Sequence, residues 1–328
     1  MQKKSTDTNH LTTVMYHYVR DFARTRYGAI KGITPDAFDG QLSYIQKHYC
    51  VIRMEELFER LADGAALPEH PLLLTFDDGL ADHYETVLPL LEKRRMRGSF
   101  FPPGRAIAER AVLDVHKIHF ILAASQEVGA LASDIRAFLD EHRKAYALPS
   151  YEAYQEQYAV ERKRDGAEVM FVKNMLQKGL PETLRQVLIR ELFARIVTAD
   201  EKAFAHELYM DAAALKHMKQ RGMYIGSHGW NHAWLNTLSE EKREEEVARS
   251  SAFLAGLGVD MKRWAISYPH GGYDEALMAL LRRHGCVAGF TTEVGIGAKG
   301  ENPLAYRRLD TNDLPFDQAH PFRAIQVK

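Results

Sequence analysis

The sequence has few of the features that mark a secreted or membrane-bound protein. It contains two cysteines, Cys50 and Cys286, which are too few for a disulfide framework, and we expect both to be buried as small hydrophobic side chains. No apolar run approaches the ~18 residues of a membrane helix. The N-terminus holds lysines but no apolar stretch after them, so we predict no secretory signal and a cytoplasmic protein.

The sequence also lacks an excess of either charge, because 43 lysines and arginines balance 44 aspartates and glutamates. This balance gives no overall electrostatic reason to bind nucleic acid or an acidic membrane. Hydrophobic residues make up 46% of the 328 residues and charged residues 27%, which is typical of a globular protein with a substantial core. The composition therefore excludes disorder, collagen-like structure and a coiled coil for the bulk of the chain.

Strand and helix patterns alternate in the first and last thirds of the chain. The run Pro71–Phe76 is a continuous apolar strand of the kind that parallel sheets bury on both faces, and a helix is expected over Asp82–Met96. Later, Trp264–Tyr268 and Cys286–Thr292 are expected strands on either side of a helix at Asp274–His284. Repeated strand–helix units predict a parallel α/β sheet, and their number favours a barrel.

The middle of the chain differs, because residues 105–204 carry helical patterns, little proline or glycine, and no clear strand. We therefore expect a barrel formed by residues 1–104 and 205–328 with an all-helical insertion at 105–204. The amphipathic helices of the insertion need a partner surface, supplied by each other, by the barrel or by a second subunit. A homo-oligomer formed through the insertion is one such arrangement.

Two segments hold the residues from which chemistry is expected. Asp77 and Asp78 end the buried strand before Gly79, and adjacent carboxylates there are costly unless they bind a cation or act in catalysis. A helix N-cap followed by a turn explains the same residues about equally well. His228 and His232 follow another strand, and their spacing would place both imidazoles on one face of a helical turn, where they can share a metal. Ordinary surface or core histidines are the alternative.

Together, Asp78, His228 and His232 would form a three-ligand site with an open position for water. This is the arrangement of a catalytic rather than a structural zinc. We therefore expect a divalent metal as cofactor, with zinc as the expected ion.

The segments TFDDG and SHGWNH, in this order and each at a predicted strand end, resemble motifs of the NodB-like polysaccharide deacetylases, carbohydrate esterase family 4. A third segment, Ile266–Asp274, is close to another motif of that family. The resemblance covers about Thr13–Gly104 and Leu208–Asp310 and leaves the helical insertion outside. It implies a deformed (β/α)7-type barrel and a metal-dependent hydrolase that removes an N-acetyl group from an aminosugar in a polysaccharide or glycan precursor.

The resemblance also implies a role for individual residues. Asp77 would be the general base, and the backbone N–H of His270 would help to hold the oxyanion. The metal ligands would be Asp78, His228 and His232.

Three family features are missing from this sequence. Gly229 stands where a hydroxyl-bearing residue usually follows the first metal histidine, and Ser267 and Tyr268 stand in place of the arginine that orients the base. The usual C-terminal Leu-x-His, which supplies the general acid, is also absent. A subgroup resembling poly-N-acetylglucosamine deacetylases carries an N-terminal Tyr-His motif instead, so His17 would be the general acid here. Arg308 is a candidate for the missing arginine.

The same site could hydrolyse an O-acetyl ester, a formamide or a cyclic imide, and a catalytically silent barrel that binds glycan is a further alternative. The expected partner is an N-acetylated sugar or oligosaccharide, with no nucleic acid and no membrane span. The acidic run Glu240–Arg249 is expected to be a solvated helix face with i,i+4 ion pairs.

Overall fold

The computed structural model describes residues 10–125, 127–161, 165–297 and 300–320, and the chain divides into two compact units. The first unit contains the chain up to Asp21, Lys31–Ala111 and the chain from Ala205 onward, and it holds every strand that the structure describes. The second unit contains Phe22–Ile30 and Val112–Phe204.

The first unit is built on a curled sheet of parallel strands. In chain order these are β1 (Thr12–Tyr16), β2 (Cys50–Val51), β3 (Pro71–Asp77), β4 (Ser99–Phe101), β5 (Tyr224–Ile225), β6 (Trp264–Ser267), β7 (Cys286–Val294) and β8 (Tyr306–Asp310). They lie in the order β5-β4-β3-β1-β8-β7-β6, with β2 paired to the start of β3. A parallel bridge between Ser227 and Ile266 links the two ends of this row. Apart from β2, the strands follow one another in chain order, which is the topology of a deformed (β/α)7 barrel.

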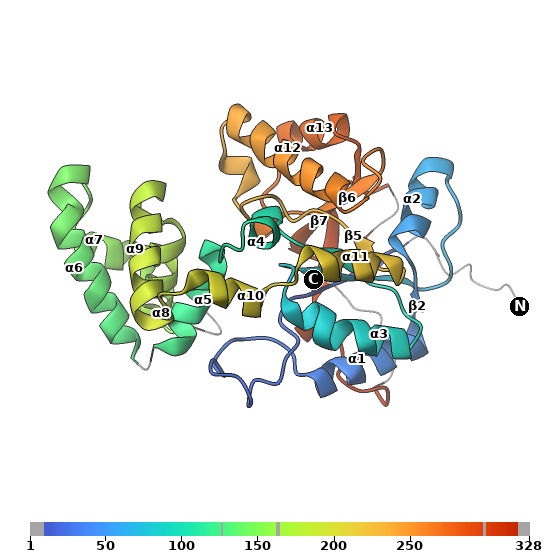
Figure 1. The fold of residues 1–328 in the computed structure, drawn as a ribbon, viewed down its shortest axis with the longest axis horizontal. Helices are drawn as coiled ribbons and strands as arrows, with labels where there is room; N and C mark the ends of the chain where they lie inside the picture. The colour runs from blue at the N-terminus through green and yellow to red at the C-terminus, as the bar shows by residue number, and fades with distance from the viewer. Residues whose placement is uncertain (1–9, 126, 162–164, 298–299, 321–328) are drawn as a thin grey trace, which may run out of the picture. The chain divides into compact units, whose positions relative to one another are not determined.

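Helices surround these strands (Figure 1). They are α1 (Pro35–His48), α2 (Met54–Asp63), η1 (His83–Val87), α3 (Leu88–Lys93), α4 (Gly104–Ala108), α11 (Ala212–Gln220), α12 (Glu240–Gly256) and α13 (Glu275–Arg283), with short turns η3 (Leu235–Thr237), η4 (Pro269–Gly271) and η5 (Thr311–Asp313). The side chains of Thr34, Ser239 and Asp274 begin α1, α12 and α13, because each accepts a hydrogen bond from a backbone N–H of the first turn.

The helix expected over Asp82–Met96 is interrupted. Its first part is the π-helical turn η1, in which the N–H of Leu88 donates to the carbonyl of His83, and α3 then ends at Lys93. Pro89 has no N–H to donate to the preceding turn, so the regular α-helical hydrogen bonds cannot continue through this point.

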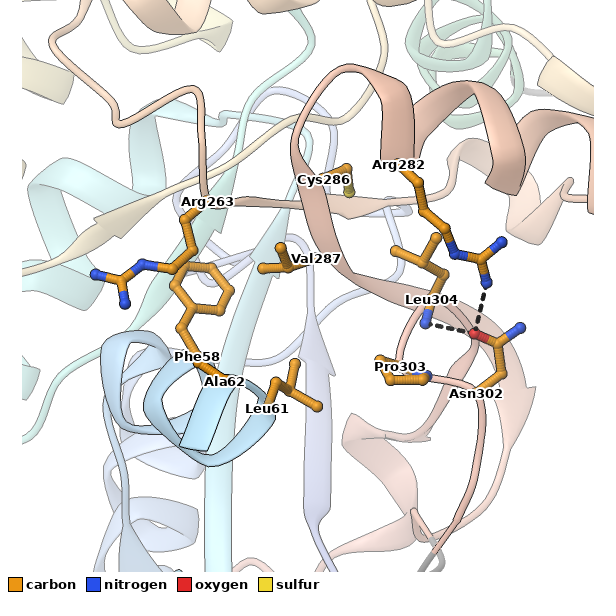
Figure 2. Close-up of a pocket in the computed structure, with 10 residues that line it drawn as sticks. All are labelled: Phe58, Leu61, Ala62, Arg263, Arg282, Cys286, Val287, Asn302, Pro303 and Leu304. Atoms are coloured by element: carbon orange, nitrogen blue, oxygen red, sulfur yellow. Dashed lines mark hydrogen bonds between the residues drawn. The ribbon is translucent and has the colours of Figure 1, made fainter. Parts of the chain in front are cut away.

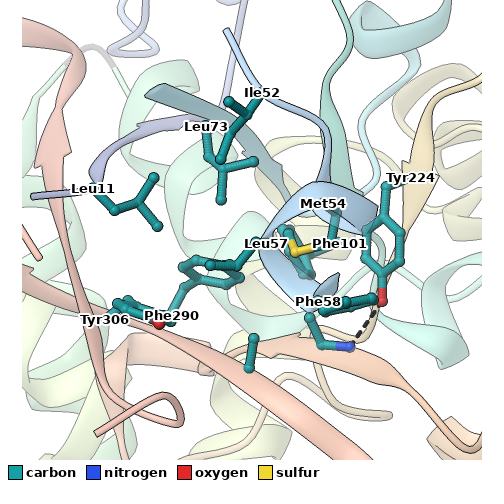
Figure 3. Packing of buried hydrophobic residues seen from close by; sticks show 12 residues of the cluster. Leu11, Ile52, Met54, Leu57, Phe58, Leu73, Phe101, Tyr224, Phe290 and Tyr306 are labelled. Carbon is teal, nitrogen blue, oxygen red and sulfur yellow. Dashed lines mark hydrogen bonds between the residues drawn. The ribbon is translucent and has the colours of Figure 1, made fainter. Parts of the chain in front are cut away.

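The side chains of β3 alternate between two buried faces, as expected for a strand covered on both sides. Leu73 lies in a hydrophobic cluster with inward-facing side chains from β4 to β8 and from α2 (Figure 3). Phe76 lies on the opposite face, where its ring stacks on Phe100 with centroids 4.7 Å apart. Since side chains repeat every second residue along a strand, Thr75 and Asp77 share the inner face with Leu73.

A pocket of about 310 Å³ lies near the N-terminal ends of β6 and β7 (Figure 2). Its lining comprises Phe58, Leu61, Ala62, Arg263, Arg282, Cys286, Val287, Asn302, Pro303 and Leu304. These residues include no carboxylate or imidazole, so this pocket holds none of the aspartates and histidines from which the sequence predicts chemistry. The other expected buried cysteine, Cys50, is exposed in β2, which corrects the sequence prediction for that residue.

The secondary-structure elements described in the second unit are all helices, whereas Phe22–Ile30 consists of turns and bends. Its helices are α5 (Asp114–Ala124), α6 (Val128–Tyr146), α7 (Tyr151–Tyr158), α8 (Ala167–Asn174), η2 (Met175–Gly179) and α9 (Glu182–Ile196), and α10 (Glu201–Leu208) leads back to the first unit. Phe22–Ile30 belongs to this unit because Tyr27 packs edge-on against Phe120 and Phe204, at centroid distances of 4.9 and 5.9 Å. No helix in the part of the chain that the structure describes is both long and apolar enough to cross a membrane.

Candidate metal centre and active site

The residues singled out by the sequence follow the C-terminal ends of barrel strands. Asp77 is the last residue of β3 and Asp78 comes next, while His228 and His232 follow β5 and His270 follows β6. Parallel strands all end at the same rim of a barrel, so residues far apart in the sequence meet there.

Asp78, His228 and His232 form a compact group of possible ligands. One ligand atom from each lies within 4.8 Å of the others, and Oδ1 of Asp78 is 3.5 Å from Nε2 of His228 and 3.4 Å from Nε2 of His232. The three residues are at most 9% exposed. Two imidazole nitrogens and one carboxylate oxygen are a donor set suited to zinc and similar divalent cations, so these side chains fit the expected metal.

The backbone turns Asp78 into this group. Asp78 has φ +77° and Gly79 has φ +66°, so two left-handed residues follow the strand in succession. A Cβ at position 79 would lie 2.8 Å from Cβ of Pro102, so the close packing of the turn also requires glycine. The unfavourable conformation of Asp78 is typical of strain retained at functional sites.

The two histidines do not lie on a helical turn, contrary to the sequence prediction. The segment after β5 is an irregular loop in which Gly229 has φ +70° and His232 has φ +57°, and left-handed residues prevent a regular helix there. The loop nevertheless brings the imidazoles of His228 and His232 to a centroid separation of 4.7 Å.

Glu246 of α12 supports this loop, and the sequence analysis missed it. Its carboxylate accepts hydrogen bonds from the backbone N–H groups of Trp230 (2.9 Å) and Asn231 (3.1 Å), and from the Asn231 side chain. Glu246 is 5% exposed, so the prediction of a solvated face for the whole acidic run is wrong at this position. Its spacing from the buried Ser250 and Leu254 was the available signal, because residues four and eight apart share one helix face.

The hydroxyl of Ser227 lies beside Gly229, where the sequence lacks a hydroxyl-bearing residue. Oγ of Ser227 accepts a hydrogen bond from the N–H of Gly229 at 3.1 Å. The loop is therefore held by Ser227 at its start and by Glu246 at its centre.

The orientation of His228 suits a metal ligand. Its Nδ1 is 2.7 Å from the carbonyl oxygen of Ser267, and because a carbonyl only accepts, Nδ1 carries the proton and Nε2 faces Asp78 with its lone pair in the neutral form. Burial disfavours the charged imidazole, but the carboxylates of Asp77 and Asp78 outweigh it and raise the pKa of His228. The site therefore attracts positive charge.

Asp77 is held by a buried ion pair. Nη2 of Arg308 is 2.8 Å from Oδ2, Nη1 donates to Oδ1 at 3.1 Å, and the Ser267 hydroxyl donates to Oδ2 at 3.0 Å. Burial alone would raise the pKa of Asp77, but Arg308, with smaller contributions from His228 and His17, lowers it below its ordinary value. Asp77 is therefore an ionised carboxylate at neutral pH, and Arg308 stands where the sequence lacked an orienting arginine.

His17 lies close to Asp77, and His270 lies close to His232. His17 follows Tyr16, which pairs with Phe76 in the β1–β3 register, so His17 is level with Asp77. The carbonyl of His17 is 2.9 Å from Nε2 of His83. His270 has φ +57° in η4, and its ring meets that of His232 edge-on at 4.4 Å.

The model of the family described as polysaccharide deacetylase matches residues 64–142 and 192–289, which is more than half of the chain. The chain belongs to the polysaccharide deacetylase family. The matched residues include both aspartates at the end of β3 and the histidine loop after β5.

One named relative of this family member matches over a short part of the chain. YxkH of Bacillus subtilis (strain 168), which is grouped by name with the polysaccharide deacetylases, is 29% identical over 108 residues. That match spans 33% of this chain and 38% of YxkH, so it covers well under half of the relative.

Solved structures share the fold of this family member at low identity. The Streptococcus pyogenes deacetylase PplD, in complex with acetate, gives a TM-score of 0.55 at 18% identity and covers 92% of each chain. IcaB from Ammonifex degensii gives 0.51 at 18% identity, covering 92% of this chain and 91% of that one. A de-N-acetylase from Aggregatibacter actinomycetemcomitans gives 0.54 at 15% identity, covering 96% and 97%.

Proposed function

We propose that this member of the polysaccharide deacetylase family is a metal-dependent hydrolase that removes an N-acetyl group from an aminosugar of a polysaccharide or glycan precursor. The observation that carries the proposal is the buried group of Asp78, His228 and His232 beside an ionised Asp77. A base and a three-ligand group at one barrel rim are an arrangement that supports metal-assisted hydrolysis of an unactivated amide. The proposal is also supported by the likeness to a structure named de-N-acetylase.

Asp78, His228 and His232 would hold the ion, with zinc proposed from the donor set. When bound, a divalent metal would activate a water molecule and polarise the acyl carbonyl. Asp77 would accept the proton of the attacking water, because Arg308 and Ser267 fix both of its oxygens and keep it ionised.

The other two proposed residues act on the oxygen and nitrogen of the amide. The backbone N–H of His270 would donate to the developing oxyanion, a contribution of about 3–4 kcal/mol per donor in other hydrolases. His17 would protonate the leaving amine, which otherwise departs as a very poor leaving group. Its place level with Asp77 supports this assignment.

Metal content and acetate release test the proposal together. His228→Ala should lose both the metal and the release of acetate from N-acetylated oligosaccharides, while circular dichroism stays that of the folded protein. His320→Ala is the matched control, because the side chain of His320 is 60% exposed and lies outside the site. Full activity of metal-free protein would contradict the metal role. Mass analysis of the products would reveal a different acyl group, and glycan binding without turnover would indicate a silent barrel.

We propose further that residues 105–204 form a helical insertion in the barrel chain, through which the protein forms a homo-oligomer. The helical unit with Val112–Phe204 supports the first part. Light scattering on the full chain and on a variant lacking 112–204 would test the second part, which predicts that only the full chain self-associates.

The cytoplasmic setting stays a prediction, and it favours small or lipid-linked glycan precursors over a mature polymer.

A further inference from the structure

An exposed tryptophan lies next to the proposed metal centre. Trp234 is two residues beyond His232 and is 47% exposed, whereas the other tryptophans, Trp230 and Trp264, are 7% and 0% exposed. Its indole stacks on the imidazole of His270, with centroids 4.7 Å apart and an angle of 12° between the planes. His270 in turn meets the ring of His232 at 4.4 Å, so a single ring separates the indole from a proposed metal ligand.

Contacts with Gly272 and Thr237 also hold Trp234 in place. A Cβ at Gly272 would come within 3.3 Å of Cε3 of Trp234, so the ring edge packs on the bare backbone of this glycine. The carbonyl of Trp234 accepts hydrogen bonds from the N–H (2.9 Å) and the hydroxyl (2.8 Å) of Thr237. A large apolar side chain that is held rigidly yet left half exposed loses little conformational entropy when a ligand covers it.

We propose that Trp234 is a specificity-determining residue on which a pyranose ring of the substrate stacks while its acyl group lies at the metal centre. This inference deepens the proposed function and rests on it for the position of the acyl group. It narrows the substrate class to glycans with a flat apolar sugar face beside the scissile amide, and it disfavours small acylated amines.

The chemistry of sugars and indoles supports this occupant. Equatorial hydroxyls leave the axial C–H groups of a pyranose on its faces, and these bear partial positive charge toward the negative face of an aromatic ring. Covering about 50 Å² of apolar surface corresponds to roughly a tenfold gain in affinity.

Acrylamide quenching of tryptophan fluorescence tests the contact directly, because only Trp234 of the three tryptophans is substantially exposed. The N-acetylglucosamine trimer should protect the fluorescence of the metal-loaded protein from quenching, and this protection should disappear in Trp234→Phe. Unchanged quenching in the presence of bound trimer would overturn the inference. Protection without acetate release would sustain the stacking role and contradict the proposed deacetylation instead.

Kinetics separate substrate stacking from structural support of His232. Trp234→Ala should lower kcat/KM for the trimer at least about tenfold more than it lowers kcat/KM for 4-nitrophenyl acetate, which has no sugar ring. Phe316→Ala is the matched control, since Phe316 is also 47% exposed but its backbone carbonyl lies against Gly40 of α1, and the substitution should change neither value. Equal losses on both substrates with loss of metal would assign Trp234 a purely structural role and overturn the inference.

Discussion

A buried ion pair defines the chemistry of Asp77. Arg308 and Asp77 are both about 1% exposed, and the arginine also donates to the carbonyl of Thr291 and to the hydroxyl of Thr75. Taking such charges out of water is costly, and breaking the pair from one side leaves the other charge buried and unpaired. The pair is therefore weak as a source of stability but effective in fixing where the carboxylate points.

Asp77→Asn should keep the metal and lose about 10²–10⁴-fold in turnover, because the amide cannot accept the proton of the attacking water. The free energy of unfolding should also fall, by about 3–5 kcal/mol, because Arg308 loses its buried counter-charge. Metal analysis, steady-state kinetics and chemical denaturation measure the three effects. Loss of metal in this variant would show that Asp77, and not Asp78 alone, is a ligand.

His17→Ala tests the proposed general acid. Amide turnover should fall by about 10²–10⁴-fold, whereas turnover of an activated ester should fall much less, because its leaving group needs no proton. His10→Ala is the control, since His10 is exposed just before the other end of β1. Equal losses on the amide and the ester would rule out the acid role.

Among the secondary-structure elements, α12 has a function beyond packing. Its residue Glu246 accepts the hydrogen bonds that hold the loop with both proposed histidine ligands, and Ser250 and Leu254 bury the same face of the helix. Glu246 would therefore support the metal site by positioning the ligand loop and without binding the metal itself, as outer-shell residues of metal sites do.

Glu246→Ala should weaken metal affinity by about 10–100-fold, because two backbone N–H groups of the loop lose their acceptor. Competition with a fluorescent chelator measures the affinity. Glu245→Ala is the matched control on the same helix, because the Glu245 side chain is 65% exposed and pairs with the surface Arg249 at 3.6 Å. Wild-type affinity in the Glu246 variant would mean that the loop is held by other contacts.

At the scale of the whole molecule, the reactivity of the two cysteine thiols shows whether the barrel is folded. Burial raises the pKa of the Cys286 thiol well above its ordinary value, whereas Cys50 is exposed. Since the thiolate is the reactive form, a disulfide reagent at mildly alkaline pH should label one thiol of the native protein quickly, and Cys50→Ser should remove that reaction. Both thiols should react in denaturant. Equal fast labelling of both in the native state would contradict the packing around Cys286.

The elements that the sequence determined are those with strong local patterns. Pro71–Phe76 is apolar except for Thr75 and forms most of β3, and the helix expected at Asp274–His284 forms α13, because hydrophobic periodicity and capping residues act within a few residues of chain. The motif residues likewise pointed to a deacetylase barrel, and the match to the family confirms that prediction. The role of each residue stays a prediction until the variants are measured.

Tertiary structure decided what depends on contacts between distant segments. The strand β8 was not recognised in the charged sequence around Arg308, because this arginine is buried by its pairing with Asp77, 231 residues away. The same holds for the irregular histidine loop, because Glu246 holds the backbone of Trp230 and Asn231, between the left-handed residues Gly229 and His232, from a helix whose sequence predicts a solvated face. Local sequence sets which residues can fold into a strand or helix, but only the closed sheet determines which charges are brought together out of water.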